Sequence, residues 1–432
     1  MVAGITTFFF VFSVVYAIVS RFRGFAAMIW RGSEQSERVY FVVMMSILGV
    51  VMAVAHGLSP IFWGDDTLPQ RGNDFIFGLD VGRNTAPDGQ FVSTTSFALT
   101  RLFYPLVNLP FAMAARALGR ILFFIPLAYL YFLQLFHIGL MACGGILLAR
   151  ICNITGFTKK YFLALYTVSY SFLLFSLPPE QYVLPTFCAV LLMYVCINAP
   201  KAKYAVALAA AGTLTTSLAV FPFVTYARKI KAWILNLLKL GGSFVAICVL
   251  YGIFPFFNNP ERDFLSALRF AGGSIEEKTL QFINFVGSVF LRPETTLTHG
   301  IDALGVEFVA YVLAPPTSVN WIGILLIVLT IAGFIVNRKH RFAQMSILWS
   351  MLAVFVLFIV GWQAIGNEMI LSSFYFGWAF FVLVFMFFEK LLEKQKIVKY
   401  VIYSVAFVVM AVININGIID LMQFAIQYYP AR

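Results

Sequence analysis

The stretch VYFVVMMSILGVVMAVAHGLSPIF (Val39–Phe62) contains no Asp, Glu, Lys or Arg, and the polar residues WGDD (63–66) follow it directly. About 20 apolar residues are needed to cross the hydrocarbon core of a bilayer, which is about 30 Å thick. Hydrophobic residues make up 61% of the chain and charged residues 11%, too few charges to cover a water-soluble protein. We therefore expect an all-α polytopic membrane protein.

Apolar stretches of similar character recur along the chain and predict about 11 transmembrane segments in one transmembrane domain, residues 1–432. They lie near residues 1–20, 39–62, 121–149, 161–177, 183–199, 204–226, 232–255, 319–337, 342–362, 369–388 and 399–416. The first stretch lacks the basic leader and the small-residue cleavage site of a signal peptide, so we expect it to be a membrane span.

Basic residues between these stretches set the expected orientation. They gather in short clusters, which the positive-inside rule places in the cytoplasm. The stretch 204–226 has basic residues on both flanks, so we expect a hairpin that is broken near Gly212–Ser217. Four segments are then expected on the outer face of the plasma (inner) membrane: residues 63–120, 178–181, 256–318 and 361–368. Because the clusters form no continuous face, the net charge of +11 does not predict nucleic-acid binding.

The two large outer loops, 63–120 and 256–318, are both expected to carry helices at the membrane surface. Ser274–Leu291 has apolar residues at helical spacing beside charged residues, which favours an interfacial helix. Phe97–Leu118 mixes arginines with apolar runs, and its two prolines keep it from spanning the bilayer.

Acidic residues of the first outer loop are the candidates for catalysis. Asp80 and Arg83 lie three residues apart, a spacing that places carboxylate and guanidinium on one helical face. This pair is either a surface ion pair or a general base with its orienting cation. Asp65 and Asp66 fit acid–base chemistry or a divalent ion, or else a helix cap. The loop has no Asp-x-Asp motif and the chain no glycine-rich phosphate loop, which argues against a soluble nucleotide substrate.

Several cations are expected on the outer side, where the positive-inside rule gives no reason for them: Arg71, Arg83, Arg101, Arg262, Arg269, Lys278 and Arg292. They fit either anionic lipid headgroups or the phosphate of a lipid-linked substrate, which Arg binds through two parallel hydrogen bonds. His299 of the second loop is either a solvated side chain or a phosphate ligand. The five cysteines lie in or beside apolar stretches and predict neither a disulfide nor a metal site.

A set of motifs together resembles a known superfamily. In chain order they are Asp80-x-x-Arg83, Asp88, Arg101 followed by Tyr104–Leu106 (YPL), SLPPEQYVL (Ser176–Leu184), the threonine-rich break Gly212–Ser217 and GNEMILSSFYF (Gly366–Phe376). The chain is similar to the integral-membrane glycosyltransferases of the C type (GT-C), and within them to uncharacterised bacterial families with the same Pro-Glu-x-Tyr element. The resemblance spans roughly residues 39–390.

The resemblance implies a site on the outer face. Such enzymes use a sugar carried on a polyprenyl phosphate, with an acid of the first outer loop as catalytic base or acceptor-positioning group. It implies Asp80 as the base, with Asp65 and Asp66 as rivals, and Arg83 as its orienting or phosphate-binding partner. The other residues expected near the substrate are Asp88, Arg101, Tyr104, Glu180, Tyr182, Arg269, Lys278, Arg292, His299 and Glu368.

The chain departs from the family at two points: Tyr104 stands where relatives have His, and residues 1–20 lie outside the usual core. The expected reaction is a single inverting displacement in cell-envelope glycan biosynthesis, with a lipid, glycan or protein acceptor and membrane lipids as further partners. No cofactor is required, and a divalent cation is optional, because Arg alone neutralises a lipid monophosphate leaving group. The alternatives are a transporter or flippase of lipid-linked sugars, and a glycan polymerase or ligase.

Overall fold

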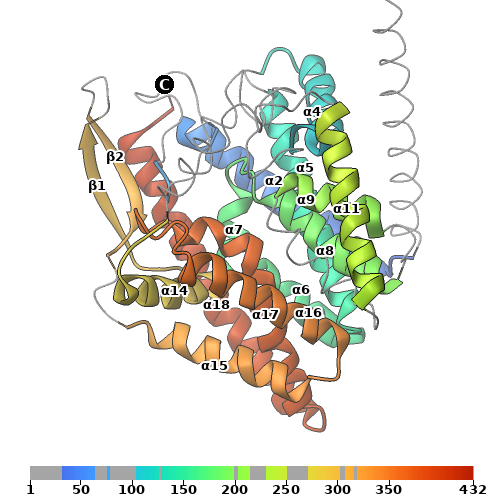
Figure 1. Cartoon of the computed structure of the whole chain (residues 1–432). Coiled ribbons are helices and arrows are strands. Elements are labelled where there is room, and N and C mark those ends of the chain that lie inside the picture. Colours follow the sequence, from blue (N-terminus) through green and yellow to red (C-terminus); the bar gives the residue numbers. More distant parts are fainter. Residues whose placement is uncertain are drawn as a thin grey trace, which may run out of the picture. The chain divides into compact units, whose positions relative to one another are not determined.

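The computed structural model describes residues 32–63, 75–77, 104–125, 128–198, 203–214, 230–250, 271–301, 307–315 and 319–431, which form thirteen α-helices and one β-hairpin (Figure 1). The helices are α2 (Gln35–Leu58), α4 (Tyr104–Ile121), α5 (Ala128–Ile151), α6 (Gly156–Thr167), α7 (Tyr170–Ser176), α8 (Val183–Asn198), α9 (Lys203–Thr213), α11 (Ile230–Leu250), α14 (Ile275–Phe290), α15 (Trp321–Val336), α16 (Arg341–Ala353), α17 (Ser373–Leu391) and α18 (Lys396–Tyr428). The strands are β1 (Thr295–Ile301) and β2 (Glu307–Leu313). Shorter helical pieces are Pro60–Phe62 and Met369–Ser372 (3₁₀) and Val354–Ile359 (π).

The chain divides into two compact units, Met1–Val43 and Met44–Arg432. In the first unit, the described residues carry the first turns of α2, where the Glu37 carboxylate accepts a hydrogen bond from the backbone N–H of Glu34 at 3.0 Å. The second unit carries the rest of α2 and every other described element.

Helix α17 is the centre of the second unit. All of its residues from Ser373 to Met386 are buried, and it packs against α8, α14, α15 and α16. The Phe381 ring lies against the rings of Phe162 and Phe290, with centroids 5.5 and 5.6 Å away. A helix that is hydrophobic all round is stable only when neighbours cover every side, and that is the position of α17.

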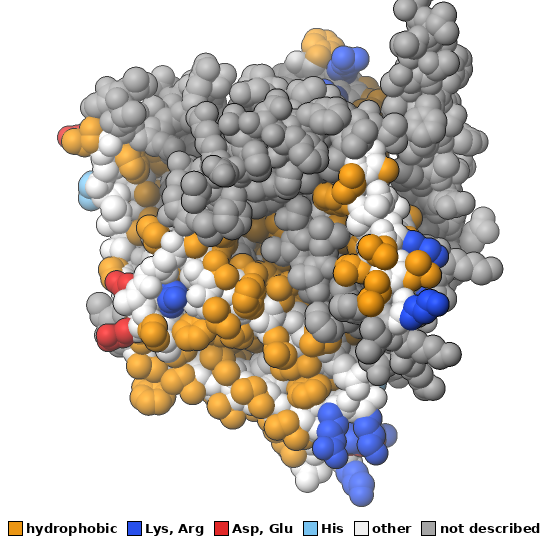
Figure 2. Space-filling model, in the orientation of Figure 1, with side chains coloured by type: hydrophobic (Ala, Val, Ile, Leu, Met, Phe, Trp, Pro, Cys, Tyr) orange, Lys and Arg blue, Asp and Glu red, His pale blue; other side chains and the backbone are white. Residues whose placement is uncertain are grey.

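The peripheral helices expose large apolar side chains. Leu325 of α15 is 55% exposed and Val405 of α18 is 57% exposed. Figure 2 shows hydrophobic side chains across the described surface on one side, with one group of Lys and Arg at the lower end and other Lys and Arg toward the edges. Among the described residues, five helical segments are long and apolar enough to cross a membrane: α2, α5, α16 with the π-helical piece, α17 with the 3₁₀ piece, and α18. This agrees with the expected helical membrane protein, while the number of 11 spans stays a prediction.

The predicted span 161–177 is two helices rather than one. The chain turns at Val168 and Ser169, between the end of α6 and the start of α7. The Ser169 hydroxyl donates to the carbonyl of Tyr166 at 2.6 Å, in competition with the helical backbone pattern. The carbonyl of Val168 at this break accepts from Nδ2 of Asn414 at 2.7 Å. A partner from another helix thus satisfies the broken backbone.

Helix α18 is longer than the predicted span 399–416. Asn414 and Asp420 lower the hydropathy of its second half, yet the helix continues to Tyr428. Both polar residues are tolerated because they have partners: Asn414 bonds two backbone carbonyls, and Asp420 forms an ion pair with Arg292. With 33 residues the helix extends about 50 Å, beyond a hydrocarbon core of about 30 Å.

The second outer loop holds a β-hairpin that the all-α prediction missed. Strands β1 and β2 are antiparallel, with Thr295 opposite Leu313 and Ile301 opposite Glu307. Strand β1 is rich in Thr, and strand β2 is rich in Val and aromatic residues, which are residue types typical of strands. That composition is the signal that identifies them.

The helix predicted over Ser274–Leu291 is confirmed, but its apolar face lies against protein rather than on a membrane surface. Helix α14 begins with a capping box, in which Ser274 Oγ accepts from the Glu277 N–H and the Glu277 carboxylate accepts from the Ser274 N–H. Most of Gln281–Phe290 is buried, and α14 packs against α7, α15 and α17. The apolar pattern is therefore satisfied by neighbouring helices.

Two further predicted features lie partly within the described residues. The first outer loop contains a helix, α4, with Pro110 inside it and α5 and α9 as neighbours. Helix α9 ends at Thr213, inside the predicted break Gly212–Ser217. The remainder of the predicted hairpin, and the predicted span 1–20, lie outside the described residues.

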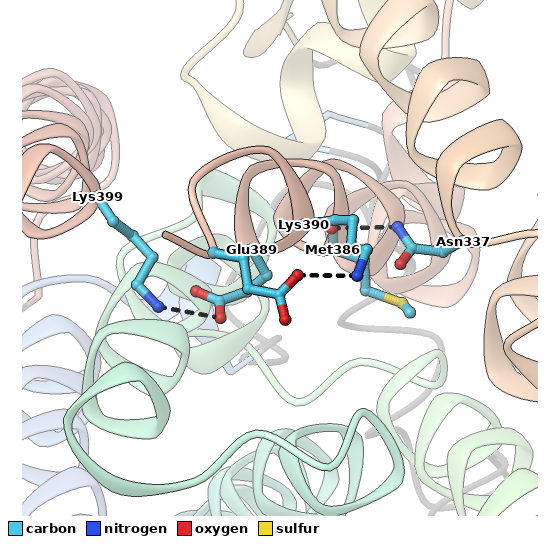
Figure 3. Close-up of polar contacts among 6 residues, drawn as sticks. Asn337, Met386, Glu389, Lys390 and Lys399 are labelled. Carbon is cyan, nitrogen blue, oxygen red and sulfur yellow. Dashed lines mark hydrogen bonds and ion pairs between the residues drawn. The ribbon is translucent and has the colours of Figure 1, made fainter. Parts of the chain in front are cut away.

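Two connectors lie side by side at one end of the second unit. Asn337, which follows α15, donates its side-chain amide to the carbonyl of Met386 at 3.1 Å (Figure 3). In the last turn of α17, the Glu389 carboxylate accepts from Nζ of Lys399 at 3.3 Å and from the Tyr403 hydroxyl at 2.7 Å. We call residues 337–341 and 389–399 the basic face. Its exposed cations are Arg338, Lys339, Arg341, Lys390, Lys394 and Lys396.

Candidate functional site

The two loops predicted to lie outside, 63–120 and 256–318, meet through backbone hydrogen bonds between their described residues. The Phe77 N–H donates to the Tyr311 carbonyl at 2.7 Å, and the Tyr311 N–H donates to the Phe75 carbonyl at 2.8 Å. Residues 75–77 thereby join β2 as a short parallel strand. The described residues of the two predicted loops are therefore in contact, while the side of the membrane on which the loops lie stays a prediction.

Two short turns join the same assembly. Asn367 donates its side-chain amide to the carbonyl of Ala314, just after β2, at 3.1 Å. Gln363 donates its side-chain amide to the Tyr182 hydroxyl at 3.1 Å. We call the set of residues 75–77, the turn 176–182, β1–β2 and the turn 361–372 the loop face.

The turn SLPPEQY (Ser176–Tyr182) between α7 and α8 is buried throughout. Its two prolines end α7, because they cannot donate to the preceding carbonyls. Gln134 of α5 donates its amide to the last two carbonyls of α7 at 3.1 and 2.9 Å. The Leu177 carbonyl accepts from Nε2 of His56, 3.0 Å away. Side chains from two other helices therefore fix the turn.

Glu180 is only 1% exposed in this turn. Ionisable side chains are rarely buried among apolar helices, so Glu180 is a candidate functional residue. The neighbouring Gln181 is also buried, and within the part of the chain that the structure describes its Oε1 atom has no hydrogen-bond partner. The turn thus holds two buried polar side chains, Glu180 and Gln181, in apolar surroundings.

The turn after the π-helical piece is conformationally strained. Gln363 has φ of 64° and Asn367 has φ of 59°. The left-handed region costs a non-glycine residue about 1–2 kcal/mol. Such strain, and π-helical geometry such as that of Val354–Ile359 just before it, are both enriched at functional sites.

A polar relay links the two turns across 181 residues of sequence. The Ser372 hydroxyl donates to Oε1 of Gln363 at 2.7 Å, and Nε2 of Gln363 donates to the Tyr182 hydroxyl at 3.1 Å. All three residues are buried, with exposures of 4, 5 and 7%. Hydrogen bonds are stronger in such low-dielectric surroundings, so this relay fixes the relative position of the turns.

The structure brings four of the predicted site residues to the neighbourhood of these turns. Glu180 and Tyr182 belong to the buried turn, and Glu368 closes the strained turn, its N–H donating to the Gln363 carbonyl at 2.9 Å. Lys278 donates its Nζ to the Ile359 carbonyl, 3.4 Å away, at the start of the same turn.

Three other predicted residues lie apart from this group or have another partner. Tyr104 is fully buried as the first residue of α4, and His299 is exposed on β1 opposite Val309. Arg292 forms an ion pair with Asp420. This partner was not predicted, because Asp420 lies beyond the predicted last span, 399–416. Its charge is thus partly committed to the fold rather than wholly available to a phosphate.

The remaining candidates lie outside the described residues: Asp65, Asp66, Asp80, Arg83, Asp88, Arg101 and Arg269. Among the residues that the structure does describe, no group of three His, Cys, Asp or Glu side chains is placed to hold a metal ion. The optional divalent cation beside the first-loop acids stays a prediction.

No known relative identifies the chain. No family model matches it, and comparisons with curated proteins and with solved structures find no match. Its function is therefore inferred from the chemistry and geometry of the loop face.

Sequence reasoning did not find the residues that support the two turns: His56, Gln134, Gln363 and Ser372. The first two are polar residues inside or at the end of apolar spans, and polar groups at that depth are themselves a signal. Ser372 lies in the motif Gly366–Phe376 and Gln363 in the predicted turn 361–368, but neither was singled out, because their contact with Tyr182 joins residues far apart in sequence.

Tyr311 connects the hairpin with the first loop and with α18. Burial raises the pKa of its hydroxyl, and the nearby Asp420 adds to the rise, while a hydrogen bond from Thr295 and the charge of Arg292 oppose it. The Thr295 hydroxyl donates to this oxygen at 2.9 Å. Tyr311 is therefore neutral at ordinary pH and serves as a packing and hydrogen-bonding centre of the loop face.

Proposed function

We propose that the protein transfers a sugar from a polyprenyl-phosphate donor to an acceptor at its loop face. The observation that carries this proposal is the junction of both predicted outer loops with the buried turn that holds Glu180. Phe77 pairs with Tyr311 of the second loop, and Tyr182 is held by Gln363 of the late turn. A lipid-linked substrate requires such a place, where polar groups adjoin apolar helices.

The proposed reaction is a displacement at the anomeric carbon. The acceptor hydroxyl attacks this carbon, the bond from the carbon to the phosphate oxygen breaks, and the lipid monophosphate leaves with the bonding electrons. Asp80 takes the proton of the acceptor, and Arg83 stabilises the charge on the leaving phosphate. Glu180 binds the sugar through hydrogen bonds between its carboxyl group and sugar hydroxyls.

The test is transfer by the purified protein reconstituted in lipid vesicles with a radiolabelled polyprenyl-phosphate sugar. Loss of a catalytic base lowers the rate by roughly 10²–10⁴-fold, so Asp80→Asn should abolish measurable transfer while the protein stays folded. Asp65→Asn and Asp66→Asn should retain activity. The matched control is Glu276→Gln, since Glu276 is exposed at the start of α14.

Two results would contradict the proposal in different ways. Full activity of Asp80→Asn together with an inactive Asp65→Asn or Asp66→Asn would move the base to that residue. Movement of the intact labelled lipid between leaflets, with no release of the sugar from phosphate, would replace the glycosyltransferase by a flippase.

A further inference from the structure

We propose that the basic face binds the phosphate groups of anionic phospholipids, whose acyl chains lie along the exposed apolar side chains of α15 and α18. This proposal is independent of sugar transfer, because it concerns the ends of α17 and α18 that lie away from the loop face.

Hydrogen bonds hold the two connectors of the basic face together. Asn337 donates its side-chain amide to the carbonyl of Gly333 in α15 and to that of Met386 in α17, at 2.9 and 3.1 Å. In the second connector, Lys399 donates to the Glu389 carboxylate (Figure 3). The cations of the two connectors therefore belong to one surface, and Figure 2 shows a group of Lys and Arg at the lower end of the view.

The basic face carries more positive charge than its own acids neutralise. Both of its acids already have a lysine partner, in the ion pairs Lys399–Glu389 and Lys390–Glu393. Within the part of the chain that the structure describes, three exposed cations of this face form no ion pair: Arg338, Lys339 and Lys396. A concentration of positive charge of this kind attracts an anion from outside the chain.

Exposed apolar side chains directly adjoin these cations. Ile335 is exposed near the end of α15, three residues before Arg338. On α18, Ile397 is 82% exposed immediately after Lys396, and Val401 is exposed one turn further along. Nucleic acid or an acidic peptide would use the cations alone. A phospholipid matches both parts of the surface, because it offers an anionic phosphate and apolar chains.

The length of α17 places the basic face at the depth of lipid headgroups. The helix begins directly after the turn 361–372 of the loop face and carries Lys390 in its last turn. Its 19 residues extend about 28 Å, close to the thickness of a hydrocarbon core, about 30 Å. Helix α18 runs between the same two surfaces, since the Tyr429 hydroxyl at its end donates to the carbonyl of Val309 in β2 at 2.7 Å.

Native mass spectrometry of the full chain, released from neutral detergent micelles, tests the proposal. The probes are dioleoyl phosphatidylglycerol, which is anionic, and dioleoyl phosphatidylcholine, which has the same acyl chains and no net charge. Each Lys or Arg near an anionic lipid surface strengthens association roughly fivefold. Wild type should therefore prefer phosphatidylglycerol about tenfold or more, and the double variant Arg338→Gln/Lys396→Gln should bind it roughly 25-fold more weakly.

Matched variants separate the basic face from charge and apolarity in general. Arg120→Gln/Lys239→Gln removes two exposed cations from α4 and α11 and should keep the wild-type preference. Ile397→Gln should weaken the binding of both lipids about threefold, because an acyl chain loses apolar contact. Ile426→Gln, at an exposed position near the other end of α18, should bind phosphatidylglycerol as wild type does.

Several outcomes would overturn the proposal. Equal affinity of wild type for the two lipids, or unchanged binding by Arg338→Gln/Lys396→Gln, overturns the lipid site, and an equal loss in Arg120→Gln/Lys239→Gln overturns its location. Glycerol phosphate bound as tightly as phosphatidylglycerol would replace the lipid by a soluble anion, and displacement of the lipid by a single-stranded oligonucleotide would replace it by nucleic acid. Should the double variant fail to fold, unchanged binding of both lipids by Ile397→Gln overturns the proposal.

Discussion

The loop face and the basic face hold their polar groups in opposite ways. At the basic face most polar groups are charged and exposed, and Lys390 pairs with Glu393 three residues away while 53 and 64% of the side chains stay exposed. At the loop face the relay is neutral and buried, and its partners are 181 residues apart. Clusters of exposed charges can be recognised in the sequence and used to predict topology, whereas buried neutral hydrogen-bond partners are brought together only by the complete fold.

This contrast has an energetic consequence. An exposed ion pair contributes about 0–1 kcal/mol to stability, because water and salt screen it. A buried polar group that loses its partner costs about 1–3 kcal/mol, because nothing replaces the bond. Single substitutions should therefore matter far more among buried polar groups than among the exposed cations of the basic face.

The largest effect is expected for Asn414→Leu in α18. The Asn414 amide donates to the carbonyls of Val168 and Phe290, and its oxygen accepts from the Arg292 N–H. Losing all three bonds should lower the free energy of unfolding by about 3 kcal/mol or more, measured by denaturant titration in mixed micelles. Asn416→Leu is the matched control, since Asn416 is exposed two residues away and should change little. Equal losses in the two variants would contradict this view.

The ion pair of Lys399 with Glu389 is more buried than the other charged groups of the basic face, so substitutions in it should destabilise the protein more. Lys399→Met leaves the Glu389 carboxylate without its cation, and we expect a loss of about 2 kcal/mol. This is less than a fully buried pair would lose, because the Glu389 side chain is 27% exposed. Lys390→Met, near the end of α17, should change the free energy of unfolding little, because solvent screens its exposed pair with Glu393. The same unfolding titration decides, and similar values for both would remove the distinction between the pairs.

Substitutions at Gln363 test how much its left-handed backbone conformation costs in stability. Gln363→Ala should cost about 2 kcal/mol through lost hydrogen bonds. Gln363→Gly should cost about 1 kcal/mol less than Ala, because glycine adopts the left-handed conformation without strain. At Gln344 in α16 the order should reverse, since glycine in a helix is about 1 kcal/mol worse than alanine. The same order at both positions would argue against backbone strain at Gln363.

The smallest effect is expected at the exposed first turn of α14. Hydrogen bonds from the backbone N–H and hydroxyl of Ser274 lower the pKa of Glu277 in the folded state. A lowered carboxyl pKa contributes stability that is present above the unfolded pKa and lost as the pH falls through the folded value. Below that pH, hydrogen exchange should show that the amides in the first turn of α14 lose more protection than the amides of the other helices. In Glu277→Gln this additional, pH-dependent loss of protection should be absent.

The sequence predicts features that depend on local hydropathy. The apolar stretch 319–337 corresponds to α15, Trp321–Val336, because nothing polar interrupts it. The predicted end of the last span, at residue 416, was wrong, because α18 continues to Tyr428. Asp420 lowers the local hydropathy, and its partner Arg292 is more than a hundred residues away in the sequence. Charge clusters predicted that the two large loops share one side of the membrane, which stays a prediction; the structure shows that residues 75–77 bond to β2.

The candidate site could be predicted only in part for the same reason. The motif SLPPEQY marked Glu180 and Tyr182 by its prolines and its acid inside an apolar region. The residues that hold this motif, such as Gln134 and Gln363, depend on helix packing that no local pattern encodes. The acids of the first loop, with Asp80 as the predicted base, lie outside the described residues.

The most direct test of the loop face as the site of chemistry compares two glutamates in one transfer assay. Glu180 is buried in the turn, and Glu276 is exposed on α14. With a radiolabelled polyprenyl-phosphate sugar, Glu180→Gln should lose roughly 100-fold or more in kcat while its unfolding midpoint stays close to wild type. Glu276→Gln should match wild type. A Glu180→Gln variant as active as wild type would contradict the central claim that this face carries the reaction.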